Sequence, residues 1–331
     1  WRGIEDGVFG NNGEQPEEYR NKKMYGLRTD YFFYLIALLM VPLSAFLVKF
    51  NAFEVIGELH LHSSILIGLL IIILAIIAKN MMDFSRIENF RLITVLVLTL
   101  FITVFWSFFE LAGTAITLFA ERNVNLVLMN ASQTNAINPG YIMFLAIPFS
   151  LMWVALAKAQ KNPTTPIKFA LGILQLGLGF LVFAMSAQFM DDAGKTPFLF
   201  LMLGYFLMTT GELFISPIGL SKVTELSPKK MTAFMMGVYF LSSSFAHYIS
   251  KFIANATISG SEDVPEPGFM TTIIEKVTGF AGATTDSTIE GVNSLLNYTS
   301  VFTQVGVVAI GVAILAFILS PVLKKWMNGV H

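Results

Sequence analysis

The chain has 331 residues, of which 55% are hydrophobic and 13% are charged, with a net charge of −1 and a mean hydropathy of +0.68. Soluble domains carry about 25% charged residues, so the composition excludes an ordinary soluble protein and predicts an all-α, polytopic membrane protein. The near-neutral charge gives no reason to expect a nucleic-acid partner, and the absence of cysteine excludes disulfides, thiolate metal sites and cysteine nucleophiles.

The first thirty residues are polar and of mixed charge, and the chain begins at Trp1 rather than at a methionine. Their glycines and scattered charges predict a cytoplasmic linker over residues 1–30, and the lack of an apolar run excludes a cleavable signal peptide. We therefore expect the chain to be a fragment of a longer protein.

Eight apolar segments follow the linker, each close to the length of about 20 residues that a helix needs to cross a bilayer. They cover residues 31–50, 62–79, 92–119, 139–159, 167–189, 197–221, 231–256 and 299–323. The first two carry no buried charge and are predicted to be packing or scaffold helices. A long connection at about 257–298 separates the last two segments.

Basic residues predict the orientation of these segments in the membrane. Most of the 21 Lys and Arg residues precede the first span, follow an even-numbered span or end the chain. The opposite connections are mainly acidic. By the positive-inside rule the basic side is the cytoplasm, so both termini are predicted to be cytoplasmic.

The sixth span contains an isolated carboxylate, because Glu212 is the only residue between Phe198 and Leu220 that carries a charge at neutral pH. A charge near the centre of a membrane costs about 2.5–3.5 kcal/mol and usually faces a partner or a water-filled path. Ser216 lies one turn later on the same face, and the flanking glycines allow close helix packing. The alternative is that the Glu212 side chain is hydrogen-bonded inside the helix bundle and has no further function.

The third span carries polar side chains at spacings of three and four residues, which predicts that they share one helical face. The stripe consists of Thr103, Trp106, Glu110, Thr114 and Thr117. Threonine hydroxyls can bond to their own helix and mean little alone. Glu110 favours a face that lines a cavity.

For polar residues in two other spans, a purely structural role is an alternative to a functional one. Asn138 precedes Pro139 at the start of the fourth span, where helix capping alone would account for it. The seventh span contains a run of polar residues, namely Tyr239, Ser242, Ser243, Ser244, His247 and Tyr248. Hydrogen bonds between packed helices explain this run as well as a substrate pathway does. His247 is a candidate proton site, although Lys251 one turn later places it near the interface.

Several stretches together resemble the proton-dependent oligopeptide transporters of the major facilitator superfamily. They are residues 105–110 with 118–123, residues 137–139 and, most specifically, the Gly-Glu-Leu-Phe-Ile-Ser-Pro-Ile-Gly-Leu-Ser run at 211–221. On this resemblance residues 91–331 would be the C-terminal six-helix bundle. Residues 31–90 would be the extra helix pair that bacterial members insert between their two bundles.

The resemblance also implies roles for the polar residues. Glu212 would engage the amino group of a peptide and pair with a lysine of the N-terminal bundle when the site is empty. Asn138 would help to hold the same end of the peptide, and Ser216 would line the pocket. Glu110 would pair with an arginine of the N-terminal bundle and act in gating or proton coupling.

Trp106 and Tyr239 complete the candidate substrate-binding residues. Many family members have tryptophan where this chain has Tyr239, and glutamine where it has Leu111, so side-chain selectivity is expected to differ. The Glu-x-x-Glu-Arg motif of the family's first helix is absent from this sequence, which is why the N-terminal bundle is expected to lie outside the chain.

The implied function is proton-coupled symport of di- and tripeptides across a bacterial inner membrane, without a cofactor and with the proton gradient as the energy source. The expected partners are small peptides, protons, the lipid bilayer and the N-terminal six-helix bundle. One alternative is a family member that moves an anion or a drug-like amine. The other is a membrane-embedded scaffold or enzyme, although metalloprotease, serine-hydrolase and P-loop motifs are absent.

Overall fold

The computed structural model describes residues 23–49, 54–56, 59–127, 129–259, 269–279 and 290–330. Residues 1–22 of the predicted linker, and residues 260–268 and 280–289 of the predicted loop, lie outside the described residues. The chain divides into two units, residues 1–72 and 73–331, and each is described by itself.

The first unit consists of two small hairpins and apolar helices. Strand β1 (Lys23–Met24) pairs antiparallel with β2 (Leu27–Arg28), and β3 (Glu54–Ile56) pairs with β4 (Leu59–His60). Tyr25 and Gly26 turn the first hairpin with φ angles of 50° and 85°. Helix α3 (Thr29–Lys49) follows it, and α4 (Leu61–Met81) continues across the boundary into the second unit.

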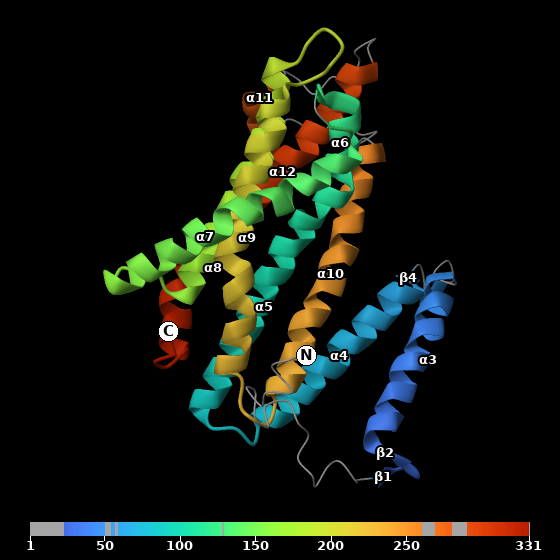
Figure 1. Cartoon of the computed structure of the whole chain (residues 1–331), viewed down its shortest axis with the longest axis vertical. Helices are drawn as coiled ribbons and strands as arrows, with labels where there is room; N and C mark the ends of the chain where they lie inside the picture. The colour runs from blue at the N-terminus through green and yellow to red at the C-terminus, as the bar shows by residue number, and fades with distance from the viewer. Residues whose placement is uncertain are drawn as a thin grey trace, which may run out of the picture. The chain divides into compact units, whose positions relative to one another are not determined.

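The named elements of the second unit are all helices in its described residues, and an isolated β-bridge joins Val124 to Thr196 (Figure 1). Its elements after α4 are α5 (Arg86–Phe109), η1 (Glu110–Gly113), α6 (Ala115–Asn123), η2 (Ser132–Ala136), α7 (Ile137–Lys158), α8 (Thr165–Met185), η3 (Ser186–Phe189), α9 (Phe198–Leu226), α10 (Thr232–Ser259), α11 (Phe269–Thr278) and α12 (Glu290–Trp326). Helix α5 begins with a capping box, in which the Ser85 hydroxyl and the Glu88 carboxylate satisfy backbone N–H groups reciprocally.

Seven helical segments in the described part of the chain are long and apolar enough to cross a membrane, which confirms the prediction of a polytopic all-α membrane protein. The predicted seventh span corresponds to α10, whose 28 residues also suffice in length. Its hydropathy is lower because Ser242, Ser243, Ser244 and His247 interrupt the apolar sequence.

One predicted boundary is wrong, and one predicted helix is interrupted. Residues 257–298 are not wholly a loop, because they contain α11 and the first turns of α12, which begins at Glu290 rather than near residue 299. The predicted third span is not one continuous helix. It tightens into the 3-10 turn η1, and Thr114, with φ −127° and ψ −92°, separates that turn from α6.

Helix α8 lies at the centre of the second unit and packs along both α9 and α12. Glycines make these contacts close, since a Cβ atom at Gly211 of α9 would lie 2.6 Å from the Gly172 carbonyl oxygen of α8. Between α8 and α12, a Cβ atom at Gly177 would lie 2.9 Å from the Gly306 carbonyl oxygen. The predicted role of Gly211 in close packing is therefore confirmed.

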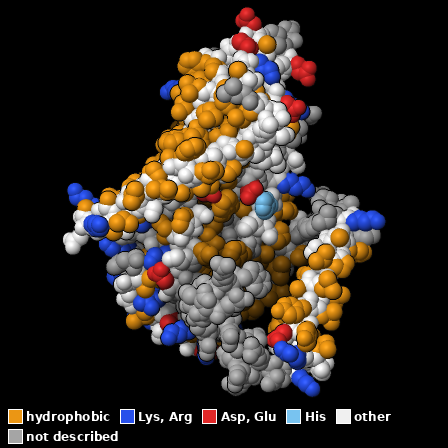
Figure 2. Space-filling model, in the orientation of Figure 1, with side chains coloured by type: hydrophobic (Ala, Val, Ile, Leu, Met, Phe, Trp, Pro, Cys, Tyr) orange, Lys and Arg blue, Asp and Glu red, His pale blue; other side chains and the backbone are white. Residues whose placement is uncertain are grey.

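Helix α7 is the least enclosed helix of this group, with Ile137 its one buried residue. It packs on α9 through aromatic pairs, among them Tyr141 with Phe206 and Trp153 with Phe214, whose ring centroids lie 5.6 and 5.1 Å apart. Hydrophobic side chains gather on the exposed surface of α7 (Figure 2). They include Met143, Phe144, Ile147, Leu151 and Val154.

Asn123 joins three segments at the end of α6. Its buried amide donates to the carbonyl oxygens of Gly194 and Gly291 at 3.0 and 2.7 Å, and its Oδ1 accepts from Ser294 at 2.9 Å. In the adjoining turn, the backbone N–H of Lys195 donates to Asp191 at 2.8 Å and is the main cause that lowers the pKa of that carboxyl. This polar network joins the end of α6 to the turn before α9 and to the first turns of α12.

Candidate functional site

Glu212 lies in the middle third of α9, within a segment apolar enough to span a membrane. Its Oε2 accepts a hydrogen bond of 2.9 Å from the side-chain amide of Asn138 on α7. The same amide also donates to Thr209 Oγ1 at 3.0 Å, and Thr209 in turn donates to the Tyr205 carbonyl at 2.7 Å. Residues 74 positions apart in the sequence are thus joined in one polar cluster.

The interpretation of Asn138 as a helix cap is wrong. Helix α7 begins at Ile137, one residue earlier, and the residue at its cap position is Ala136, which makes no side-chain cap bond. Asn138 therefore belongs to the first turn of the helix, and its side chain reaches across to α9. The sequence shows a polar residue at this position, but it does not show which helix its side chain contacts.

Glu110 lies in the turn η1 rather than on a continuous helical face, so the predicted stripe of five residues is interrupted after Trp106. The hydroxyls of Thr103 and Thr117 bond to carbonyl oxygens of Thr99 and Ala112 in the same segment. Thr103 therefore behaves as a self-satisfied helix threonine, whereas the Thr117 hydroxyl also accepts a bond of 2.9 Å from the Asn135 amide of η2.

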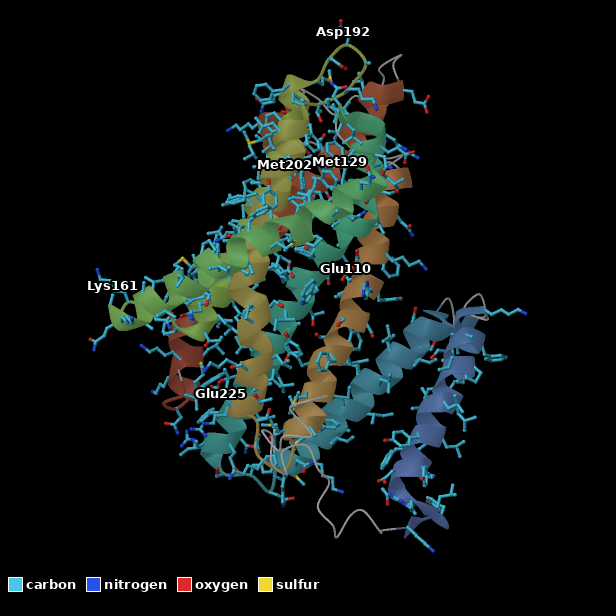
Figure 3. The ribbon with its side chains drawn as sticks, in the orientation of Figure 1. Glu110, Met129, Lys161, Asp192, Met202 and Glu225 are labelled. Carbon is cyan, nitrogen blue, oxygen red and sulfur yellow. The ribbon has the colours of Figure 1, made fainter. Side chains whose placement is uncertain are left out.

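The turn places Glu110 on the side of α5 that faces α10 (Figure 3). There Glu110 Oε2 lies 3.5 Å from Nδ1 of His247, and their side chains are 33% and 61% exposed. This pair was not predicted, although both residues were separate candidates for proton chemistry. The contact is an ion pair only when the imidazole is protonated.

The remaining candidates lie on three different helices. Trp106 of α5 is half-buried and packs edge-on against Phe105 and Phe109. Tyr239 of α10 packs against Gly219 of α9, where an added Cβ atom would lie 2.9 Å from the tyrosine hydroxyl. Ser216 follows Glu212 by one turn and is half-buried.

Two separate carboxylate centres result from this arrangement. One holds Glu212 between α9 and α7, and the other holds Glu110 beside α10; within the described residues no hydrogen bond or ion pair joins them. A carboxylate in a partly dehydrated site can alternate between pairing with a cation and protonation. No cluster of three His, Asp or Glu residues suited to a metal ion occurs among the described residues.

Comparisons of the sequence and of the fold with known proteins relate this chain to one family of transporters. The model of the POT family (PTR2) matches residues 29–271. The Bacillus subtilis transporter YclF is 29% identical over 271 residues, which are 80% of this chain and 47% of YclF. Dipeptide and tripeptide permease B of Shigella dysenteriae is 26% identical over 293 residues, or 87% of this chain and 55% of the permease. The chain thus spans about half the length of these relatives.

A crystal structure of a peptide transporter POT in complex with sulfate matches the fold with a TM-score of 0.64 at 24% identity, covering 91% of this chain and 54% of that structure. The structure of tetrameric PepTSo2 matches with a TM-score of 0.65 over 97% of this chain and 59% of its own. The family match covers most of the sequence, including both carboxylate centres. The chain is therefore a multi-pass membrane protein that belongs to the POT family.

Proposed function

We propose that the complete transporter, meaning the full-length polypeptide that contains this chain, is a proton-coupled symporter of di- and tripeptides. The observation that carries the proposal is the hydrogen bond of 2.9 Å between Asn138 and Glu212 inside a membrane-spanning segment. An amide and a carboxylate together present an acceptor-rich site for the ammonium group of a peptide. The names of the matched peptide permeases support this substrate class.

In this proposal the chain supplies the C-terminal half of the binding site, and an N-terminal six-helix bundle supplies the other half. Glu212 binds the amino group of the substrate or, in the empty site, a lysine of that bundle. Asn138 orients the Glu212 carboxylate, and Ser216, Trp106 and Tyr239 line the pocket from α9, α5 and α10.

Glu110 acts in proton coupling or gating, and pairs alternately with an arginine of the other bundle and with His247. A carboxylate that exchanges a cation partner for a proton changes the charge of the site in each cycle, which links proton entry to movement of the bundles. The proton gradient is the energy source, and no cofactor takes part. The protein lies in the bacterial inner membrane with both ends of this chain in the cytoplasm.

The test is uptake of labelled dialanine by proteoliposomes that contain the complete transporter, with an imposed inward proton gradient. Glu212→Gln keeps the shape of the side chain but removes its charge, so we expect gradient-driven uptake to fall to the level of empty liposomes. Glu290→Gln, the same change on an exposed residue at the start of α12, is expected to leave uptake unchanged.

Each outcome has a definite meaning. No dialanine uptake by a well-folded wild type would assign the transporter another substrate. Gradient-driven uptake that survives Glu212→Gln would remove Glu212 from the mechanism and move the proton site to Glu110.

A further inference from the structure

A second polar site lies away from Glu212, Asn138 and Glu110. It is a pocket of about 460 Å³ between the α7–α8 turn, the first turn of α8, the last part of α9 and the end of α12. We call it the lysine pocket, because Lys168, Lys222 and Lys324 line it together with Thr164, Ser221 and Asn162. Its described lining contains no Asp or Glu.

Two of these lysines are buried, with 9% of Lys168 and 8% of Lys222 exposed. A buried ammonium group is unfavourable unless a partner compensates its charge. Lys222 donates to Glu225 at 2.5 Å. Lys168 lies over the ring of Trp153, with Nζ 4.2 Å from the centroid, and no carboxylate pairs with it in the described part of the chain. Positive charge in the lysine pocket is therefore only partly neutralised.

The same pocket also contains hydrogen-bond donors without an acceptor in the described part of the chain. Thr164 occupies the cap position of α8, but its hydroxyl makes no cap bond. That hydroxyl oxygen is buried and has no hydrogen-bond partner among the described residues. Pro166 in the first turn of α8 has no backbone N–H and the Lys168 N–H bonds to the Thr164 carbonyl, but the other first N–H groups have no acceptor within the helix, and the positive end of the helix dipole favours an anion there.

We infer that the lysine pocket binds a phosphate-type anion. Ammonium groups, a hydroxyl and helix N-terminal N–H groups are the donors that phosphate oxygens accept from, and the pocket volume of about 460 Å³ lies within the range of ligand-binding pockets. On the basic side of a membrane, basic pockets between helices bind the headgroups of anionic phospholipids. A phospholipid headgroup and free inorganic phosphate are the two sources of this chemistry.

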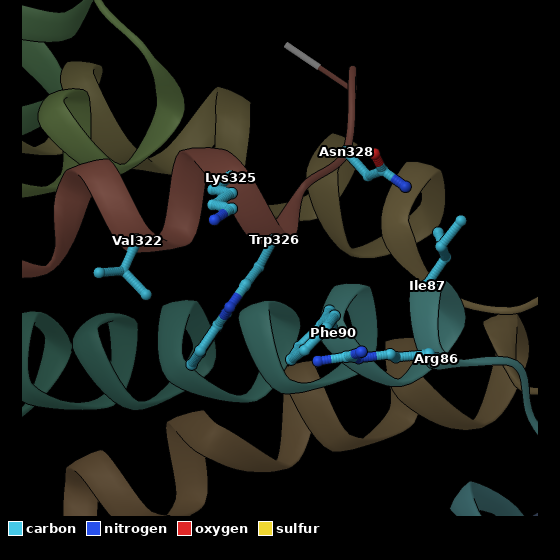
Figure 4. Close-up of a pocket in the computed structure, with 7 residues that line it drawn as sticks. All are labelled: Arg86, Ile87, Phe90, Val322, Lys325, Trp326 and Asn328. Carbon is cyan, nitrogen blue, oxygen red and sulfur yellow. The ribbon is translucent and has the colours of Figure 1, made fainter.

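A second basic pocket provides an internal control (Figure 4). It measures about 540 Å³ and lies between the first turn of α5 and the end of α12, with Arg86 and Lys325 in its lining. Both of these cations are exposed rather than buried. Arg86 lies over Phe90, and Phe90 stacks on Trp326 with ring centroids 5.5 Å apart, so aromatic packing occupies this site.

The experiment is native mass spectrometry of the complete transporter in a non-ionic detergent with added phosphatidylglycerol or phosphatidylcholine. Lys324→Gln removes one exposed charge from the lysine pocket, and Lys325→Gln removes the neighbouring charge from the control pocket. We expect about fivefold weaker phosphatidylglycerol retention for Lys324→Gln, the usual effect of one lysine near anionic lipid. Lys325→Gln is expected to match the wild type.

Thr164→Val, which leaves every charge in place, provides a second variant and is also expected to weaken retention. Inorganic phosphate distinguishes the two sources. If calorimetry detects phosphate binding that both pocket variants weaken while phosphatidylglycerol is not retained, the anion is free phosphate. The inference is overturned if Lys324→Gln and Lys325→Gln have equal effects, or if neither phosphatidylglycerol nor phosphate binds better than phosphatidylcholine.

Discussion

At the scale of single residues, Asn138 bonds α7 to the polar side chains of α9, beside a contact made by aromatic pairs and by one bond from the Tyr141 hydroxyl to the Met202 carbonyl. Its amide supplies both N–H donors, one to Glu212 and one to Thr209. A carboxylate accepting such a bond has a fixed direction before any substrate arrives. Asn138 is therefore expected to affect substrate binding through Glu212 as well as directly.

Asn138→Ala is expected to lower the thermal stability of the purified protein and to raise the KM for dialanine. The substitution removes two hydrogen bonds between helices, and each such bond contributes about 0.6–1.7 kcal/mol to the stability of a membrane protein. Asn80→Ala is the matched control, because the Asn80 amide bonds to a carbonyl of its own helix. Thermal unfolding in detergent and uptake kinetics measure the two effects; an unchanged KM would exclude Asn138 from the binding site.

His247 and Glu110 form a contact whose strength depends on protonation of the imidazole. His247→Gln keeps a polar side chain but cannot acquire charge. We expect the dependence of gradient-driven uptake on external pH to become flatter in this variant, with Lys251→Gln, one turn later, as the control. Uptake measured over a series of external pH values tests this; identical profiles for His247→Gln and wild type would rule out a role for the pair.

At the scale of elements, the packing of α8 against α9 depends on Gly172 and Gly211, whose backbones touch. A methyl group at Gly211 would press on a carbonyl oxygen, which cannot rotate away as a side chain can. We predict that Gly211→Ala destabilises the protein by about 1–3 kcal/mol, the cost of overpacking.

Gly311→Ala of α12 is the opposite case, since nothing lies within 4 Å of an added Cβ atom. Alanine is the better helix former by about 1 kcal/mol in soluble hosts. The unfolding midpoint in detergent is therefore expected to fall for Gly211→Ala and to stay the same or rise for Gly311→Ala. Equal shifts in both variants would contradict the close approach of α8 and α9.

The sequence predicted the helices well because an apolar run of spanning length admits few other structures in a bilayer. It did not predict the turn at Glu110, because spacings of three and four residues describe a regular helix and contain no information about where the helix tightens. Nor could it predict the bond between Asn138 and Glu212, since a local pattern cannot measure the distance between residues 74 positions apart. Glu110, Glu212 and Asn138 could be named as candidates, but their partners required the fold.

At the scale of the whole molecule, the chain spans about half the length of its relatives, 47% in the case of YclF. Sites of facilitator type lie between two bundles that move against each other. We therefore predict that the 331-residue chain, reconstituted alone, shows no gradient-driven dialanine uptake, whereas the complete transporter in parallel liposomes does. Uptake by the chain alone would refute the proposed division of the site between two bundles.

The backbone contact between Gly172 and Gly211 also has a practical consequence for measuring motion. Helix α8 packs closely on both α9 and α12, so it is a suitable reference element for distance measurements. Because this chain contains no cysteine, paired spin labels can be attached at chosen positions in it without removing any thiol of its own. One label on α8 and another on α7 or α10 would record the displacement of each helix during the cycle as a change in a single distance.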